Sequence, residues 1–450
     1  MKSILMKLMC AALFFSSLYS KDVAITVYNQ NRALVREQRQ LNIQSGVSTI
    51  SFSDVAARID PTSVHFKSIT AADKLNILEQ NFEYDLVSAD KILEKYVDES
   101  IQLITTEGDV YSGTLLSASG SDIVLGDRDG GIKIIKGQSV QYFDFPELPD
   151  GLITRPTLVW LIRNSGPETH KTEISYMTSG VDWHAEYVAV TDSKDKNLDL
   201  SGWVSVNNRS GATYEQAKIK LVAGDVNVVQ PQAKRMERTM DLMAVTSESG
   251  EQFEEKSFFE YHLYTLQRKA TLKNNQIKQI SLFPPASTAV QKIFIYDGAR
   301  YQNKVRVHLE FKNSKNKGLG LPLPKGKIRV YKQDDDGALE FIGEDQIDHT
   351  PKDETIQIYL GNAFDLVGER IQKHVQKLSK RSREEKYEIT LKNHKNEDVD
   401  IVVREHFWGD WTIQQKTHQF DKTDARTAEF SVHVPSDEEV VVSYSVILSW

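Results

Sequence analysis

Apolar and polar residues alternate along most of this chain, a pattern typical of β-strands that bury one face. Turn-forming residues such as Ser45 and Gly46 separate the alternating runs. The first of these runs cover residues 23–28, 33–41, 47–52 and 64–69. Residues 21–86 are therefore predicted to form a small antiparallel β unit.

One helix interrupts the alternation. Ser88 can cap its N-terminus, and Ile92, Leu93 and Tyr96 recur at helical spacing across residues 88–99. Five short strands follow, at residues 101–105, 110–117, 123–125, 132–135 and 140–143. The tight turns between these strands favour hairpins that close into a small barrel. With Gly113 at a sharp bend, residues 87–145 resemble an Sm/SH3-like small barrel that carries one short helix.

The alternation resumes beyond residue 146, and the chain there repeats itself. Four strands end in asparagine just before a turn, at Asn164, Asn208, Asn313 and Asn393. Two of these corners continue through a further strand to a tryptophan, Trp183 or Trp411. We expect each asparagine to take a left-handed or side-chain-bonded turn position and each tryptophan to anchor a core. This predicts two β-sandwich units, Ig-like or fibronectin-like, at residues 146–310 and 311–450.

One segment of the first predicted sandwich has few strand-forming residues. It covers residues 230–256 and is expected to be a mobile loop within the first sandwich. Met236, Met240 and Met243 recur in it at helical spacing. They allow an amphipathic turn that meets a partner or a lipid surface, but a solvated insertion is the favoured interpretation.

The first twenty residues have the character of a leader. Lys2 and Lys7 precede a short apolar run, and small residues up to Ser20 follow it. This predicts a signal peptide over residues 1–20, cleaved near Ser20, and thus export to the periplasm or cell envelope. The run is too short for a membrane-spanning helix. Cys10 lies inside the leader, so the mature chain is expected to contain no cysteine.

The charge of the chain argues against nucleic acid as a partner. The formal net charge is −8, and removal of the two leader lysines would make it −8 − 2 = −10. An acidic surface repels the phosphate backbone. The small barrel also lacks the basic and stacking residues that RNA binding needs.

Several phrases of the sequence resemble a known family. The phrases begin at Gly180-Val181-Asp182-Trp183, at Asn207-Asn208-Arg209-Ser210-Gly211 and at Leu360-Gly361-Asn362-Ala363-Phe364-Asp365. Over about residues 150–450 the chain is similar to the domain of unknown function family 4139, which includes relatives of the mucoidy-inhibitor-A type. The resemblance implies a β-rich exported or envelope-associated protein and supplies no catalytic residues. In this chain the small barrel takes the place of the long coiled coil of that type.

The sequence offers little evidence of catalysis. It contains neither a Gly-x-Ser-x-Gly elbow nor a His-Glu-x-x-His motif. At Arg404, Glu405 and His406, strand alternation sends Arg404 and His406 to one face and Glu405 to the other, and a surface pair is the favoured interpretation. Residues 334–337 resemble the start of a calcium loop, but the distant glutamate is missing, so a charged hairpin turn is preferred. No catalytic, cofactor-binding or metal-binding residue is therefore predicted, and the binding residues stay unknown.

Two further segments have open interpretations. The basic run at residues 373–383 contains Lys373, His374, Lys377, Lys380, Arg381 and Arg383. It suits anionic lipid heads or an acidic partner, although lysines that block an edge strand explain it better. In the last strand, residues 442–450 alternate between the two faces, and the strand ends in the aromatic residue Trp450. The closing strand of an outer-membrane barrel has the same pattern. The heavily charged faces of earlier strands favour the last strand of a soluble sandwich.

These observations predict an exported, all-β, non-catalytic envelope protein that acts as a binding or scaffold module. Its partner is expected to be another envelope protein or a surface component, with peripheral membrane contact as a further possibility. The alternatives are a periplasmic hydrolase of envelope glycan or peptide and an outer-membrane-associated β protein. Its oligomeric state does not follow from the sequence.

Overall fold

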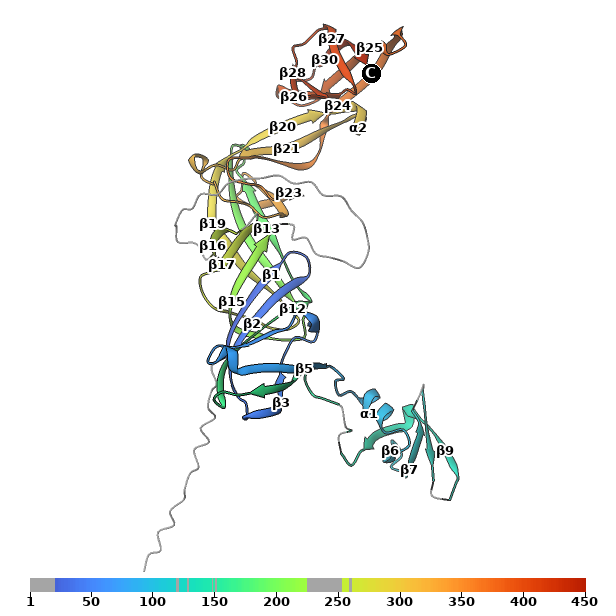
Figure 1. Ribbon diagram of the computed structural model, residues 1–450. Coiled ribbons are helices and arrows are strands. Elements are labelled where there is room, and N and C mark those ends of the chain that lie inside the picture. The colour runs from blue at the N-terminus through green and yellow to red at the C-terminus, as the bar shows by residue number, and fades with distance from the viewer. Residues whose placement is uncertain are drawn as a thin grey trace, which may run out of the picture.

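The computed structural model confirms the all-β fold class (Figure 1). It describes residues 21–450 apart from 119, 120, 128, 148, 150, 151, 225–252, 259 and 260. The predicted leader and the three methionines of the predicted loop lie outside the described residues. Within the described ranges, no helix is both long and apolar enough to cross a membrane.

Two large sheets pack face to face in the middle of the molecule. The first contains, in order, β16 (Phe253–Phe258), β17 (Tyr261–Leu266), β15 (Tyr214–Ala223), β1 (Asp22–Tyr28), β2 (Arg32–Asn42), β12 (Thr169–Ser179) and β4 (His65–Ser68), and β18 (Ala270–Leu272) pairs with β15. The second contains β19 (Gln276–Ala289), β14 (Asn197–Asn208), β13 (Val181–Thr191), β22 (Gly326–Gln333) and β23 (Leu339–Ile347). Buried and less buried residues alternate along β12 and β13, and the buried faces of both sheets share one core. Trp183 is buried in this core, as predicted.

A three-stranded sheet extends the same core. It contains β3 (Gly46–Ser53), β11 (Thr157–Asn164) and β5 (Leu75–Glu83), with β11 in the centre. Trp160 of β11 is fully buried against Phe52 and Phe66. Two single-turn 3-10 helices, Pro61–Ser63 and Ala72–Lys74, flank β4.

The strand pairing in the sheets does not follow the predicted domain boundaries. Strands β1 and β2 of the predicted unit 21–86 pair with β15 and β12 of the predicted sandwich 146–310. The boundary at residue 310 falls inside β21 (Lys304–Lys312), and β22 and β23 return to the first sandwich. The predicted loop 230–256 extends too far, because β16 begins at Phe253. Residues 21–86 were predicted to form an antiparallel unit, but β1 pairs in parallel with β15. The β13–β22 pair is also parallel.

The predicted small unit forms a separate five-stranded sheet at one end of the molecule (Figure 1). Its strands are β10 (Val140–Asp144), β6 (Ser100–Thr105), β7 (Val110–Ser117), β8 (Asp122–Gly126) and β9 (Ile132–Lys136), in this order, with a 3-10 helix at Gly137–Ser139. Helix α1 (Ala89–Lys95) precedes it, and the Ser88 side chain caps α1 by accepting the backbone N–H of Lys91, as predicted. A Cβ atom on Gly113 would lie 2.5 Å from the carbonyl oxygen of Gly126, so these strands approach closely only because residue 113 is glycine.

The C-terminal part of the chain forms one nine-stranded sheet at the other end (Figure 1). Its order is β27 (Asp410–Lys416), β30 (Glu439–Ser449), β25 (Ser382–Asn393), β24 (Thr355–Ser379), β21, β20 (Gln291–Tyr296), β26 (Val399–His406), β29 (Thr427–Val434) and β28 (Asp421–Asp424). The sheet folds over on itself, so that β29 contacts both β25 and β30. Their inward residues form a second core that includes Phe430, Tyr444 and Val446. Helix α2 (Gly298–Tyr301) connects β20 to β21, and a 3-10 helix at Lys315–Lys317 follows β21.

The four asparagine corners are built alike, which confirms the side-chain-bonded turn. All four side chains are buried, and none has a positive φ. Each Nδ2 donates to two or three backbone carbonyls of neighbouring segments. Each Oδ1 accepts a backbone N–H, in turn from Gly166, Ser210, Gly320 and Lys395. The asparagines therefore tie strand ends to the next layer.

Candidate functional site

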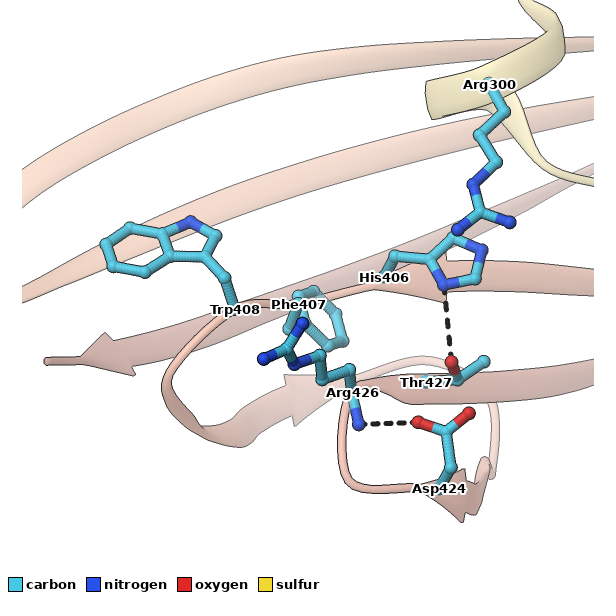
Figure 2. A pocket seen from close by; sticks show the side chains of 7 residues that line it. All are labelled: Arg300, His406, Phe407, Trp408, Asp424, Arg426 and Thr427. Carbon is cyan, nitrogen blue, oxygen red and sulfur yellow. Dashed lines mark hydrogen bonds between the residues drawn. The ribbon is translucent and has the colours of Figure 1, made fainter. Parts of the chain in front are cut away.

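A pocket of about 560 Å³ opens where β26 ends and β29 begins (Figure 2). Three structural elements supply its lining. Helix α2 contributes one arginine, and β26 contributes its last residue, a histidine, together with the two aromatic residues that follow it. The end of β28, the start of β29 and the turn between them contribute the rest. The lining residues are Arg300, His406, Phe407, Trp408, Asp424, Arg426 and Thr427.

The ring of His406 is held from both sides. Its Nε2 lies 3.0 Å from a carboxylate oxygen of Asp297, and its Nδ1 lies 3.3 Å from the Thr427 hydroxyl, its cross-strand neighbour. The other oxygen of Asp297 accepts the backbone N–H of Arg300 and caps α2. Asp297 therefore joins α2 to β26, and its carboxylate also lies 3.8 Å from Nε of Arg300. Figure 2 shows the Arg300 guanidinium beside the His406 ring.

The turn before β29 positions the second arginine. The backbone N–H of Arg426 donates to Asp424 at 2.6 Å, and the backbone carbonyl of Arg426 accepts the N–H of Phe407. The Arg426 N–H and the Thr427 hydroxyl hold the pKa of Asp424 below its usual range. Among the described residues, the Arg426 guanidinium has no hydrogen-bond partner, and Figure 2 shows it beside Phe407.

Trp408 forms the outer wall of the pocket. Its ring lies 4.9 Å from the ring of Trp450, at an interplanar angle of 45°. The guanidinium of Arg383 lies 5.3 Å from the Trp408 ring and 5.9 Å from the Trp450 ring. Both tryptophans are about half exposed, so the wall offers aromatic surface beside the two pocket arginines.

Beneath the pocket, Glu405 is fully buried, which corrects its interpretation as part of a surface pair. Arg370 binds its carboxylate through Nε and Nη2 at 2.8–3.1 Å, and the Tyr444 hydroxyl donates to it at 2.6 Å. Burial and the negative charge of Glu405 raise the pKa of Tyr444 well above its usual range. The predicted alternation is nevertheless correct, because the neighbouring residue Arg404 is partly exposed and pairs with Glu429.

The other predicted residues lie away from the pocket or at its margin. Residues 334–337 form the hairpin turn between β22 and β23, as preferred, with Gly337 at φ +87°. The basic run lies on the β24–β25 hairpin. Trp411 is only partly buried and donates to the carbonyl of Ala425. In the described part of the chain, no group of three or more His, Cys, Asp or Glu side chains is arranged to hold a metal ion.

The arrangement suits binding of an anionic group. Two guanidinium groups open onto one hollow, while protein donors already occupy the carboxylates of Asp297 and Asp424. Guanidinium groups bind carboxylates and phosphates through strong charge-assisted hydrogen bonds. The adjacent Trp408 adds a flat apolar surface. The pocket thus combines a side that carries two guanidinium groups with an aromatic side.

Sequence reasoning named only His406 among the lining residues. Arg300 lies in the short helix α2, Asp424 ends β28 and Arg426 lies in the turn after it. None of these segments has a distinctive composition, and only the fold brings them together. The adjacent pair Phe407-Trp408, followed by Gly409, was the one local signal. Two bulky aromatic residues that directly follow a strand cannot both enter the core, so one of them is expected at the surface.

Comparison with known proteins places the chain in a family of unknown function. A search of curated proteins gives no match. The model of one family matches residues 172–450, which include most of the first sandwich and the whole nine-stranded sheet with its pocket. On this match, which covers more than half of its length, the chain belongs to the family described as Domain of unknown function (DUF4139).

Proposed function

We propose that this chain is an exported, non-catalytic binding protein of the bacterial envelope, and that its C-terminal pocket receives an acidic group of the partner. One observation carries the proposal. Arg300 and Arg426 face the same hollow beside Trp408, in a chain whose net charge is −8. The Arg426 guanidinium has no ion-pair partner in the described structure, and the nearby carboxylates of Asp297 and Asp424 already accept protein hydrogen bonds, so an anionic group of a ligand can pair with the pocket arginines. Export rests on the leader-like residues 1–20.

Binding of a defined acidic probe tests the pocket. We expect a fluorescent hexaglutamate peptide to bind the purified chain more tightly than hexaglutamine, as measured by anisotropy. Charge-assisted hydrogen bonds contribute about 1.5–3 kcal/mol each, so R300E/R426E is expected to weaken binding at least tenfold. The control K315E/K317E makes the same change in net charge on the exposed 3-10 helix after β21.

Two outcomes would overturn the proposal. One is equal binding of the two peptides, and the other is equal loss of binding in the pocket variant and the control variant. Cell fractionation tests export separately. It should recover from the periplasm or envelope a chain that begins near Lys21, and a full-length chain retained in the cytosol would contradict export.

A hydrolase is the second candidate, on the strength of one specific arrangement. The ring of His406 lies between the Thr427 hydroxyl and the Asp297 carboxylate and contacts both. In a hydrolase these three groups would act as nucleophile (Thr427), base (His406) and supporting carboxylate (Asp297). Two features favour a positioning role instead: the Thr427 side chain is buried, and Asp297 also caps α2. Hydrolysis of p-nitrophenyl acetate that is lost in both H406A and T427A would support the hydrolase.

A further inference from the structure

A second surface lies beyond the pocket, at the end of the β24–β25 hairpin. We call it the tip surface. The turn between the strands is closed by a 2.8 Å contact between the hydroxyls of Ser379 and Ser382. The backbone N–H of Trp450 donates to the carbonyl of Arg381 at 3.1 Å, which brings the tryptophan pair to the same end of the sheet. The tip surface consists of Lys373, Val375, Lys377, Leu378, Lys380, Arg381, Arg383, Trp408 and Trp450.

The hairpin is an extension of the sheet with one open side. Strand β25 pairs with β30 along its whole length, as far as Ser382. On the other side of the hairpin, β24 pairs with β21 only up to Val367, and the backbone N–H of Gly368 donates to the carbonyl of Asn303. In the described structure, residues 369–379 therefore form an edge. Residues 371–381 are all exposed. The tip surface therefore stands at the end of the molecule opposite the small five-stranded sheet (Figure 1).

The charges of the tip surface are of one sign. Residues 371–383 contain five lysines and arginines, one histidine and no acidic residue. Lys373 pairs with Glu388, and Arg383 pairs with the buried Glu385. Within the described structure, the side chains of Lys377, Lys380 and Arg381 have no ion-pair partner. They leave a net positive end on an acidic chain.

Exposed apolar side chains lie among these charges. Val375 is 50 % exposed, Leu378 47 %, Trp408 44 % and Trp450 52 %. Lysines on an edge strand prevent its pairing with another chain, and this role would account for the charged residues of β24. It does not account for the two exposed tryptophans and the exposed leucine. A partner surface that offers only acidic groups would likewise pair with the charges and leave the apolar groups in water.

We propose that the tip surface docks onto an anionic lipid bilayer. Tryptophan rings are enriched at the level of the lipid headgroups, where one side of the ring is apolar and the other is wet. Each Lys or Arg near an anionic bilayer adds about 1 kcal/mol, roughly a fivefold gain in partitioning. Trp408, Trp450 and Leu378 enter the interface, and Lys377, Lys380 and Arg381 contact the headgroups.

Vesicle binding tests the proposal with the full chain. We expect sedimentation with vesicles of phosphatidylglycerol and phosphatidylcholine in equal amounts, and little with pure phosphatidylcholine. K377E/K380E should lower the partition coefficient at least tenfold, and K315E/K317E, which has the same net charge, should change it less than twofold. Equal partitioning of these two variants would overturn the proposal, as would the absence of any preference for the anionic vesicles.

Tryptophan fluorescence tests the apolar contact independently. The chain has six tryptophans, and we expect brominated lipid to quench the two of the tip surface. W408F/W450F should abolish most of this quenching, and L378S should weaken partitioning without altering the fold. Unchanged quenching in W408F/W450F would contradict the proposal.

The vesicle assay contains no acidic peptide, so its failure would leave the proposed pocket function untouched. Hexaglutamate binding that K377E/K380E weakens, without any vesicle binding, would assign the tip surface to an acidic protein partner and overturn the lipid proposal.

Discussion

Removal of Arg370 should open the C-terminal sheet locally. The variant R370A leaves the Glu405 carboxylate, which is 0 % exposed, with Tyr444 as its remaining partner. Loss of one partner of a buried ion pair costs about 3–5 kcal/mol, because the other charge stays buried without compensation. At about 3 kcal/mol, the local opening equilibrium rises more than a hundredfold. Hydrogen exchange of the backbone amides of β25, β26 and β30 measures this equilibrium.

The neighbouring strand position supplies a matched control. Arg404 and Glu429 form a partly exposed pair at 2.6 Å on the opposite face of β26. A pair that water screens contributes about 0–1 kcal/mol, so R404A should change amide exchange less than tenfold. The double variant R370M/E405M should cost less than R370M alone, because it leaves no unpaired charge. Equal effects of R370A and R404A, or a double variant whose cost equals the sum of the single costs, would refute the reasoning.

Three further predictions concern other parts of the fold. N393A loses the three hydrogen bonds that Nδ2 donates and the one that Oδ1 accepts, at about 1 kcal/mol each. N393D should destabilise the C-terminal sheet still more, because the new carboxylate faces the carbonyls that Nδ2 now contacts; calorimetry compares the two variants. Burial, with the nearby charges of Arg306 and Arg404, lowers the pKa of His308 in the folded chain to about 4. As the pH falls, this histidine is therefore protonated in the unfolded chain before it is protonated in the folded chain. Stability is then full above about pH 6.5 and falls toward pH 4, and H308F should flatten this fall in acid-unfolding curves. G113A should speed amide exchange in the small five-stranded sheet alone, and a stable sheet in this variant would contradict the close approach to Gly126.

Local features of the fold were predictable from the sequence. Alternation at period two located the strands of the small unit to within a residue or two, and Ser88 located the start of α1. The asparagine corners followed from turn chemistry, because only a short amide can both accept a nearby N–H and donate to several carbonyls. The hairpin turn at residues 334–337 likewise depends only on its own residues, so it too was predictable.

Long-range pairing was not predictable in the same way. Nothing in the local pattern shows that β1 pairs with β15, almost two hundred residues away, or that β22 and β23 return to the first sandwich. Such pairings depend on which apolar faces meet in three dimensions, and the alternation of a strand is the same for every partner. The predicted boundaries therefore followed chain order where the sheets do not.

The sequence contains an indication that Glu405 is buried, although the prediction did not use it. Ile401 and Val403 precede it at intervals of two, and all three point to the same face of β26, which is buried. A carboxylate that continues an apolar face needs a charged or hydrogen-bonding partner in the core. The partner, Arg370 on β24, could not be identified from the sequence, because many arginines were available.

Cross-linking in intact cells tests the central claim, that this chain binds an envelope partner through the arginine pocket, most directly. The wild-type chain, R300E/R426E and K315E/K317E are expressed at equal levels, cross-linked and purified, and the attached proteins are identified by mass spectrometry. The account predicts an envelope component that is attached to the wild-type chain and to K315E/K317E and is lost from R300E/R426E. The same component attached equally to all three chains, or attachment to cytosolic proteins only, would contradict it.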